Sequence, residues 1–303
     1  MNKDFVITDV KDFHLKEILE CGQCFHFSRT DSGENPNKYE YDIAACGRFL
    51  HIMEEPSANG VKLTFYDTDE WEYEHIWKNY FDLESDYGEV KRRIIDADPR
   101  LEEIIAENPG IRILNQEFFE CLISFIISQN KQIPQIKQVV RNISTLCGEK
   151  RGADTIRFFN SEFDALFPRP EQLAAVTEDD IRGCKAGFRA PYIIDATEKV
   201  ISGELSAKEL RRMPTDEARK KLMTVKGVGE KVANCVLLYS LGRTDAFPVD
   251  VWMKRICEEM YFHKDTPKDV IEREMCQKFG NIAGIAQQYI FHYSRMHPEL
   301  FEK

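Results

Sequence analysis

The sequence predicts an α+β fold in which an antiparallel β-sheet comes first and a larger, mostly helical part follows. Up to about residue 110, apolar and polar residues alternate in short runs between turn sequences, as in strands with one buried face. From Gln116 onward, apolar residues recur at helical spacing. We therefore expect an N-terminal antiparallel β-sheet domain at 1–112 and a helical core at 113–303.

The composition is that of a globular chain long enough for two domains or one large one. Of the 303 residues, 43% are hydrophobic, and no run approaches the length of ~18 apolar residues that spans a membrane. The amino-terminal residues lack the apolar segment of a secretory signal. We expect no membrane contact and a cytosolic protein. Its nine cysteines should then be reduced thiols.

The predicted sheet is built from four alternating runs, at 24–28, 39–44, 49–53 and 61–66. The segments AspSerGlyGluAsnProAsn at 31–37 and GluProSerAlaAsnGly at 55–60 are rich in turn-forming residues and should connect strands. A helix is expected near 85–96, before the change of pattern at 110–116.

The helical part begins with a segment at 118–128 that is apolar on nearly all sides, which predicts a central buried helix. Pro134 should open the next helix, which runs to Gly148, and Thr215 is a plausible N-cap for a later one. The other predicted helices lie at 170–176, 178–183, 190–203, 215–225, 230–241, 250–262, 267–279 and 282–296.

The stretch LeuMetThrValLysGlyValGlyGluLysValAlaAsnCys at 222–235 joins two of these helices through a tight turn. Gly227 and Gly229 should adopt backbone conformations barred to residues with a Cβ. They would also leave backbone N–H groups bare at the start of the second helix, where an anion is favoured. Such a helix–hairpin–helix, at about 215–242, is suited to gripping a phosphate backbone without contacting bases.

Two charged residues accompany this predicted phosphate grip. Lys231 stands in the first turn of the second helix, and Asp250 opens another helix behind Pro248. Each has an ordinary explanation, because most lysines are solvated surface residues and Asp is a favoured N-cap. However, nearby hairpin dipoles and partial burial would favour the neutral, nucleophilic amine of Lys231. A lysine and a carboxylate beside a phosphate grip suggest chemistry on DNA.

The charge distribution permits such a partner although the net charge is −11. Affinity for DNA depends on cations that meet phosphates, so an evenly acidic surface would exclude it. Between Lys185 and Arg255, 14 Lys and Arg stand against 9 Asp and Glu. We therefore expect the hairpin face to bind DNA weakly and with marked salt sensitivity.

GlyValGlyGluLysValAlaAsnCys followed by ProValAsp resembles the helix-hairpin-helix/Gly-Pro-Asp DNA glycosylases, and most closely the 8-oxoguanine DNA glycosylases among them. The resemblance covers nearly the whole chain, and it implies a twisted sheet packed on the side of the helical core. Further matching segments are GlyGlnCysPhe at 22–25, AsnTyrPheAspLeu at 79–83, GlnGluPhePheGluCysLeuIleSerPheIle from 116, GlyPheArgAla from 187 and AlaGlyIleAlaGlnGln from 283.

The resemblance implies a bifunctional 8-oxoguanine DNA glycosylase/AP lyase that needs no organic cofactor. Lys231 would displace the base at C1′ and form a Schiff base with the opened sugar, and β-elimination would then nick the strand. Asp250 would stabilise the positive charge that develops on the sugar as the glycosidic bond breaks.

The same resemblance assigns four residues to the base pocket. The backbone carbonyl of Gly22 would accept the N7 hydrogen that 8-oxoguanine has and guanine lacks. Gln287 would hydrogen-bond the Watson–Crick edge, while Cys235 and Phe291 would cover the two faces of the base. Each residue type also has a plain structural role, as a turn glycine, a buried polar group that needs partners, or core packing.

Extrusion of a base leaves a gap in the duplex, and the family's candidates for filling it are Asn130, Phe188 and Arg189. Three positions depart from the family's pattern. Phe188 stands where many members have tyrosine, Gln135 where many have an arginine that contacts the orphaned cytosine, and Trp252 where many have a histidine near the phosphate. These departures concern selectivity for the opposite base rather than the reaction.

Metal sites are weakly indicated. Cys21 and Cys24 form a CxxC, but no second pair of zinc spacing accompanies them. Only two cysteines follow Asp250, so no iron–sulfur cluster is expected. A structural cation near the bound phosphate is conceivable at the hairpin carbonyls, namely those of Met223, Val225 and Val228.

Two other functions stay open from the residues. A monofunctional alkylated-base glycosylase of the same superfamily would lack Lys231. A noncatalytic helix–hairpin–helix DNA-binding protein would not need Lys231 and Asp250 together. For the glycosylase/lyase we expect a monomer whose partner is double-stranded DNA containing 8-oxoguanine. Its location would be cytoplasmic, associated with the nucleoid when bound to DNA, if the source is bacterial, and nuclear otherwise.

Overall fold

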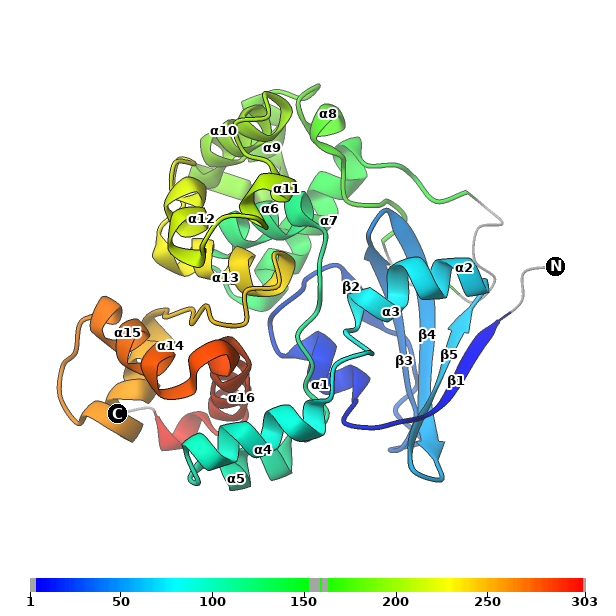
Figure 1. The fold of residues 1–303 in the computed structure, drawn as a ribbon. Helices are drawn as coiled ribbons and strands as arrows, with labels where there is room; N and C mark the ends of the chain where they lie inside the picture. The colour runs from blue at the N-terminus through cyan, green and yellow to red at the C-terminus, as the bar shows by residue number, and fades with distance from the viewer. Residues whose placement is uncertain (1–3, 153–158, 160–162, 302–303) are drawn as a thin grey trace.

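A computed structural model describes residues 4–152, 159 and 163–301 (Figure 1). A five-stranded antiparallel sheet occupies one side of the molecule and helices make up the rest, which confirms the predicted α+β class. The strand order is β1-β5-β4-β3-β2. The strands are β1 (Phe5–Val10), β2 (Phe27–Arg29), β3 (Tyr39–Ala45), β4 (Arg48–Ser57) and β5 (Gly60–Tyr66).

The α-helices of the described chain are α1 (Leu15–Glu20), α2 (Glu70–Glu72), α3 (Lys78–Tyr80), α4 (Tyr87–Ala97), α5 (Leu101–Glu107), α6 (Phe118–Ser128), α7 (Ile133–Cys147), α8 (Pro170–Leu173), α9 (Glu178–Ile181), α10 (Ala190–Ile201), α11 (Ala207–Leu210), α12 (Thr215–Leu222), α13 (Glu230–Ser240), α14 (Val251–Cys257), α15 (Lys268–Phe279) and α16 (Ala283–Met296). Wider π-helical turns occur at Tyr73–Trp77, Arg182–Ala186 and Glu258–Phe262, and single 3-10 turns at Gly187–Arg189, Gly280–Ile282 and Pro298–Leu300.

All four predicted strands are present, but the second predicted turn is shorter than expected. Strand β4 continues through Pro56, which pairs with Val61, so only two residues connect it to β5. Gly60 follows that turn with φ +144°, and an added Cβ would lie 2.3 Å from the Val10 carbonyl oxygen. Only glycine therefore allows β1 to approach the start of β5. Strand β1 was missed, and its pairing with β5 is interrupted between Ile7 and Val10.

Several short helices were missed, although α8 and α9, with 4 residues each, were predicted. Helices α1, α5 and α11 have 6, 7 and 4 residues, too few turns for a clear apolar period. The predicted N-cap at Thr215 was also wrong. Pro214 is the N-cap of α12, and the Thr215 hydroxyl donates to Asp245 Oδ2 at 2.7 Å. The Thr215 side chain therefore bonds to a residue distant in the sequence instead of capping its own helix.

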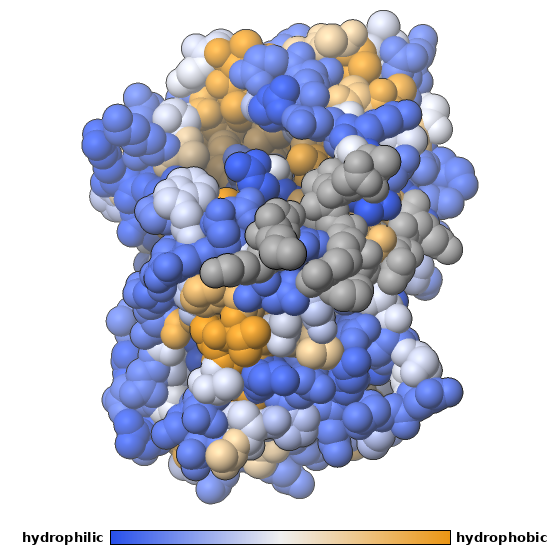
Figure 2. Space-filling view, turned by 90° about the vertical axis from the view of Figure 1, so that its right-hand side faces the viewer, coloured by the Kyte–Doolittle hydropathy of each residue, from blue (hydrophilic) through white to orange (hydrophobic). Residues whose placement is uncertain are grey.

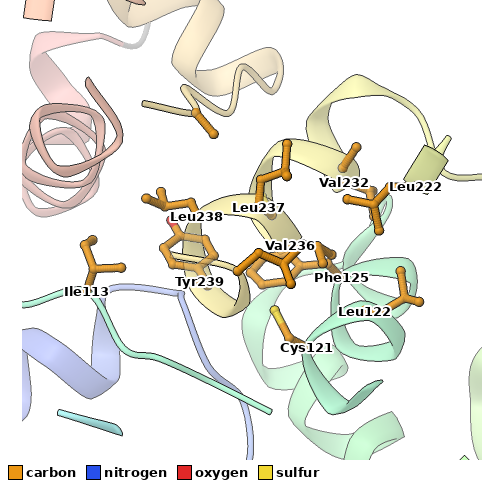
Figure 3. Packing of buried hydrophobic residues seen from close by; sticks show 14 of the residues in the cluster. Ile113, Cys121, Leu122, Phe125, Leu222, Val232, Val236, Leu237, Leu238 and Tyr239 are labelled. Carbon is orange, nitrogen blue, oxygen red and sulfur yellow. The ribbon is translucent and has the colours of Figure 1, made fainter. Parts of the chain in front are cut away.

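Helix α6 is the central helix of the fold, as its apolar composition predicted. Every residue from Phe118 to Ile127 except Glu120 is buried. Helix α13 packs directly on α6 (Figure 3), where the rings of Phe125 and Tyr239 stack with centroids 5.4 Å apart. This packing brings the first turn of α13 beside the last turn of α6.

Two main hydrophobic clusters stabilise the described chain. One joins the sheet to α1 and to the segment around α2 and α3, and the other fills the helical part. Tyr87 and Ile94 of α4 and Leu101 and Ile104 of α5 belong to the second cluster. Figure 1 accordingly shows α4 and α5 beside α16 rather than against the sheet. The first 112 residues therefore contribute to both clusters.

The surface combines hydrophilic and hydrophobic residues. The face shown in Figure 2 is covered mainly by hydrophilic residues, and its hydrophobic residues gather in a few separate patches. In the described part of the chain, no helix combines the length and apolar character needed to traverse a bilayer.

Candidate active site

The hairpin between α12 and α13 is shaped by Gly227. Its φ of +73° lies in the left-handed region, and an added Cβ would lie 2.2 Å from Tyr192 Cδ2. Gly229 differs from the prediction. It is the N-cap of α13 with φ −101°, which any residue can adopt, and no described atom lies within 4 Å of an added Cβ. Gly229 therefore keeps space open beside the helix amides rather than relieving backbone strain.

The hairpin is tied to α10. The backbone N–H of Lys226 donates to Asp195 Oδ2 at 2.8 Å, and its Nζ lies 3.7 Å from Asp195 Oδ1. Tyr192, which covers Gly227, packs edge-on against Phe188 with centroids 6.0 Å apart. Phe188 is 49% exposed. The hairpin turn and this exposed aromatic ring are thus positioned by the same helix.

Lys231 is partly buried at the start of α13. Its Nζ donates to Ser128 Oγ at 3.3 Å and lies 5.3 Å from the ring centroid of Phe125. The Ser128 hydroxyl in turn donates to the Phe125 carbonyl at 2.8 Å. The Ser128 oxygen therefore acts as the hydrogen-bond acceptor for the Lys231 amine. Sequence reasoning missed this residue, and its only signal was a polar residue at the end of a buried helix.

Asp250 is the N-cap of α14, as predicted. Its Oδ1 accepts the backbone N–H of Met253 at 2.7 Å. Within the described chain, no hydrogen bond to Oδ2 is recorded. Asp250 and Lys231 line one cavity of about 540 Å³, and its walls also include Asn130, Phe188 and Gly229. The cap therefore leaves one carboxylate oxygen for a group inside that cavity.

A second groove of about 440 Å³ shares Asp250 and Trp252 with this cavity and continues to Phe291. Trp252 is anchored there, because its Nε1 donates to Ser294 Oγ at 3.0 Å. Among the described residues on these walls, Asp250 is the one acidic side chain, and the cations are Lys131, Lys231, Arg255, Lys268 and Arg295. Partial burial, together with the charges of Arg189 and Lys185, lowers the pKa of Lys131.

Of the predicted base-pocket residues, Phe291 lines the second groove and Gly22 lies next to Phe291. Gly22 has φ +92°, and an added Cβ would lie 3.6 Å from Phe291 Cε1. Cys235 and Gln287 are only 3% and 4% exposed, and neither lines the open groove. Burial raises the pKa of the Cys235 thiol to about 11. Gln287 Oε1 is buried with no hydrogen-bond partner in the described chain, so one polar atom here awaits a donor.

The residues predicted to fill the DNA gap differ in exposure. Asn130 lies on the cavity wall with φ +52°, a conformation that Asn tolerates well. Arg189 is only 4% exposed. Its Nε and Nη2 donate to the Gln129 carbonyl, and its Nη1 donates to the Ala186 carbonyl at 3.1 Å. Arg189 therefore fixes the backbone around the cavity, with its guanidinium below the surface.

No described group of three or more His, Cys, Asp or Glu residues could hold a metal ion. All nine cysteines are free thiols. The thiols of Cys21 and Cys24 face the carbonyls of Ile18 and Leu19, and burial raises the pKa of Cys21 to about 12. At the hairpin, the Val225 carbonyl accepts the backbone N–H of Val228 at 3.1 Å.

Two family models match the chain, one after the other. Residues 5–122 match the family model of the 8-oxoguanine DNA glycosylase N-terminal domain. Residues 123–281 match that of the HhH-GPD superfamily base excision DNA repair proteins. The chain is 31% identical, over 73% of each chain, to a probable N-glycosylase/DNA lyase of Methanothermobacter thermautotrophicus.

Solved structures agree. The 8-oxoguanine glycosylase/lyase of Clostridium acetobutylicum, in complex with double-stranded DNA containing cytosine opposite 8-oxoguanine, superposes with a TM-score of 0.88. It has 34% identity and covers 98% of this chain and 97% of its own. A structure of MBOgg1 with a low-affinity DNA ligand also has a TM-score of 0.88. Its identity is 39%, covering 97% of this chain and 96% of its own.

Proposed function

The chain belongs to the HhH-GPD superfamily of base excision DNA repair proteins, and we propose that Lys231 and Asp250 carry out its reaction. The protein is a bifunctional DNA glycosylase with lyase activity, of the 8-oxoguanine type. The observation that carries the residue assignment is that both side chains line one cavity beside the hairpin amides. A DNA-binding module without catalysis would not require that pairing.

In the proposed reaction, the neutral amine of Lys231 attacks C1′ of a sugar extruded into the cavity. The C1′–N9 bond breaks, and its electron pair leaves with the base, which then takes up a proton. The free oxygen of Asp250 stabilises the positive charge on the sugar during this step. Loss of the amine proton and ring opening give the Schiff base. Removal of a C2′ proton then expels the 3′ phosphate and nicks the strand.

We assign base recognition to Gly22, Cys235, Gln287 and Phe291. The unpartnered Oε1 of Gln287 supports this assignment, because the Watson–Crick edge of a guanine-type base supplies N–H donors. The position of Gly22 next to Phe291 supports it as well. Cys235 and Gln287 are buried and do not line the open groove, so this assignment requires the base to enter more deeply than that groove reaches.

We assign the grip on DNA to the hairpin at Gly227 and Gly229, and the filling of the gap to Asn130 and Phe188. The half-exposed ring of Phe188 on the wall of the cavity supports its role as a wedge. Arg189 is assigned to the same function through the backbone carbonyls of Gln129 and Ala186 that it holds.

Borohydride trapping tests the nucleophile. Reduction of the Schiff base should lock the unmodified protein onto duplex DNA containing 8-oxoguanine. Lys231→Gln should abolish the adduct while binding persists. Lys220→Gln, which changes an exposed lysine of α12, is the matched control and should trap normally. An adduct that persists in Lys231→Gln would assign the nucleophile to another amine.

Three further proposals accompany this function. A structural cation would bind hairpin carbonyls at Met223, Val225 and Val228, whose neutral oxygens suit a hard cation, and no reaction step needs it. The protein would act as a monomer without an organic cofactor. It would work in the cytoplasm of a bacterium, or in the nucleus of another cell.

A further inference from the structure

The loop that carries Gly22 is held on both sides of that residue by buried amides. Gln288 Nε2 donates to the Cys21 carbonyl at 3.1 Å. Gln116 Nε2 donates to the Gln23 carbonyl at 2.7 Å. Within the described chain, the intervening carbonyl of Gly22 has no recorded donor. The two flanking peptides are thus immobilised, and the one between them keeps a free acceptor.

Tyr239, a residue of the helix that carries Lys231, holds the Gln288 amide and the Gln116 backbone. The Tyr239 hydroxyl donates to Gln288 Oε1, and the Tyr239 carbonyl accepts the backbone N–H of Gln116 at 2.8 Å. Gln288 is fully buried and Gln116 is 8% exposed. The position of the Gly22 loop is therefore set relative to α13 by hydrogen bonds that water cannot replace.

The side chain of Gln23 adds further hydrogen bonds that fix the loop. Its Nε2 donates to the carbonyls of Ile18 and Arg112, each at 2.8 Å, and its Oε1 accepts the backbone N–H of Leu114 at 2.8 Å. Gln23 is fully buried. The loop has therefore little freedom to turn the Gly22 peptide.

From this arrangement we propose that Gln288 and Gln116 are positioning residues that set the discrimination between 8-oxoguanine and guanine. The inference rests on the proposed role of the Gly22 carbonyl. A single acceptor distinguishes an N–H from a lone pair only if the carbonyl cannot rotate to escape the lone pair of guanine. Gln23 within the loop, and Gln116 and Gln288 outside it, prevent that rotation.

The experiment compares dissociation constants for duplexes that contain one 8-oxoguanine or one guanine opposite cytosine, in the Lys231→Gln background to prevent turnover. Gln288→Met removes both hydrogen bonds of the amide at similar volume. It should lower the guanine-to-8-oxoguanine ratio of dissociation constants about tenfold, as expected for a buried hydrogen-bond network. With Lys231 intact, Gln288→Met should cleave a preformed abasic site at the unmodified rate, because that substrate has no base.

Two further variants separate positioning from general damage. Tyr239→Phe keeps the ring stack on Phe125 but frees the Gln288 amide, so it should lower the ratio in the same direction by a smaller factor. Asn108→Leu removes a buried hydrogen bond from the side-chain amide to the Ile104 carbonyl in α5. It should lower the melting temperature without changing the ratio of dissociation constants.

The outcomes distinguish the two levels of inference. If the unmodified protein discriminates between the bases but Gln288→Met and Tyr239→Phe retain the full ratio, the positioning role is overturned. A ratio that falls equally in Asn108→Leu would also overturn it. If the unmodified protein does not excise 8-oxoguanine at all, the proposed function itself fails.

Discussion

The Asp250 carboxylate caps α14, and we propose that it also stabilises the cationic sugar. Oδ1 accepts the Met253 N–H and caps α14, while the carboxylate also lines the cavity that contains Lys231. Capping requires only an oxygen acceptor, whereas stabilisation of a cationic sugar requires negative charge. A substitution that keeps the oxygen and removes the charge therefore separates the two roles.

We predict that Asp250→Asn folds normally and excises 8-oxoguanine slowly. Asn caps about as well as Asp, so the free energy of unfolding should change by less than about 0.5 kcal/mol. Loss of the charge should slow excision roughly 10²- to 10³-fold. Thermal unfolding and single-turnover excision measure the two effects. A loss of stability that parallels the loss of activity would make Asp250 mainly structural.

At the scale of elements, the hairpin contains two glycines with different physical tasks. Gly227 needs its left-handed φ and leaves room for Tyr192, which supports Phe188. Gly229 needs neither, since its φ is −101° and the space beside it is open. The hairpin therefore requires Gly227 for its fold, whereas Gly229 leaves open space beside the helix amides.

We predict opposite phenotypes for the two alanine variants. Gly227→Ala should reduce the free energy of unfolding by roughly 2 to 4 kcal/mol, from backbone strain and the clash with Tyr192. Gly229→Ala should change the free energy of unfolding by no more than about 1 kcal/mol. Its added methyl group should nevertheless weaken DNA binding, because it lies beside the helix amides. Urea unfolding and fluorescence titration with duplex DNA test the pair. Equal losses of stability would contradict this division.

Helix α7 bears on selectivity through Gln135. The Gln135 side chain is exposed, and its Oε1 accepts the backbone N–H of Gln132 at 3.1 Å. A neutral amide used as a cap is a poor substitute for an arginine that forms bidentate bonds with a base. The guanidinium of Arg189, another residue predicted to act at the gap in the duplex, is buried against backbone carbonyls.

We therefore predict only a modest preference for cytosine opposite the lesion, and a sharper one in Gln135→Arg. A bidentate arginine contact typically contributes ~1–3 kcal/mol of discrimination. Single-turnover rates on four duplexes that differ only in the opposite base measure this preference. A cytosine preference of several hundredfold in the unmodified protein would contradict the prediction. It would indicate that Asn130, Phe188 and Arg189 are sufficient to recognise the opposite base.

At the scale of the whole molecule, the junction between the sheet and α6 contains a neutral histidine. His26 is 5% exposed, and neither ring nitrogen has a hydrogen-bond partner in the described chain. Glu120 Oε1 lies 3.8 Å from its Nδ1. Burial nevertheless dominates and, with the charges of Arg141 and Lys137, lowers the pKa of His26 to about 3.

We predict that His26 makes the protein less stable at pH 5 than at pH 7. Between pH 6.5 and about 3, the unfolded chain binds a proton at His26 that the folded chain does not, so stability falls as the pH falls. His26→Gln should remove about 2 kcal/mol of this difference in the free energy of unfolding. Urea unfolding at both pH values measures it, with the exposed His75→Gln as control. An unchanged pH dependence in His26→Gln would refute the prediction.

The sequence by itself determined the features that depend on neighbouring residues. The all-round apolar segment predicted the buried helix α6, and its observed bounds agree with the prediction. Alternation predicted β2 to β5, and Pro248 before Asp250 predicted the cap of α14. The hairpin motif predicted Lys231 beside an anion grip. Periodicity, capping and turn formation depend on residues only a few positions apart, so they can be predicted from the sequence alone.

The tertiary structure alone decided which distant residues meet. Ser128 and Lys231 are 103 positions apart, and Cys21 and Gln288 are 267 apart, yet each pair is hydrogen-bonded. Packing also buried Arg189, which sequence reasoning expected to contact DNA. Such contacts depend on how helices pack after the chain has folded, because burial and partner choice are set by atoms that no local pattern encodes.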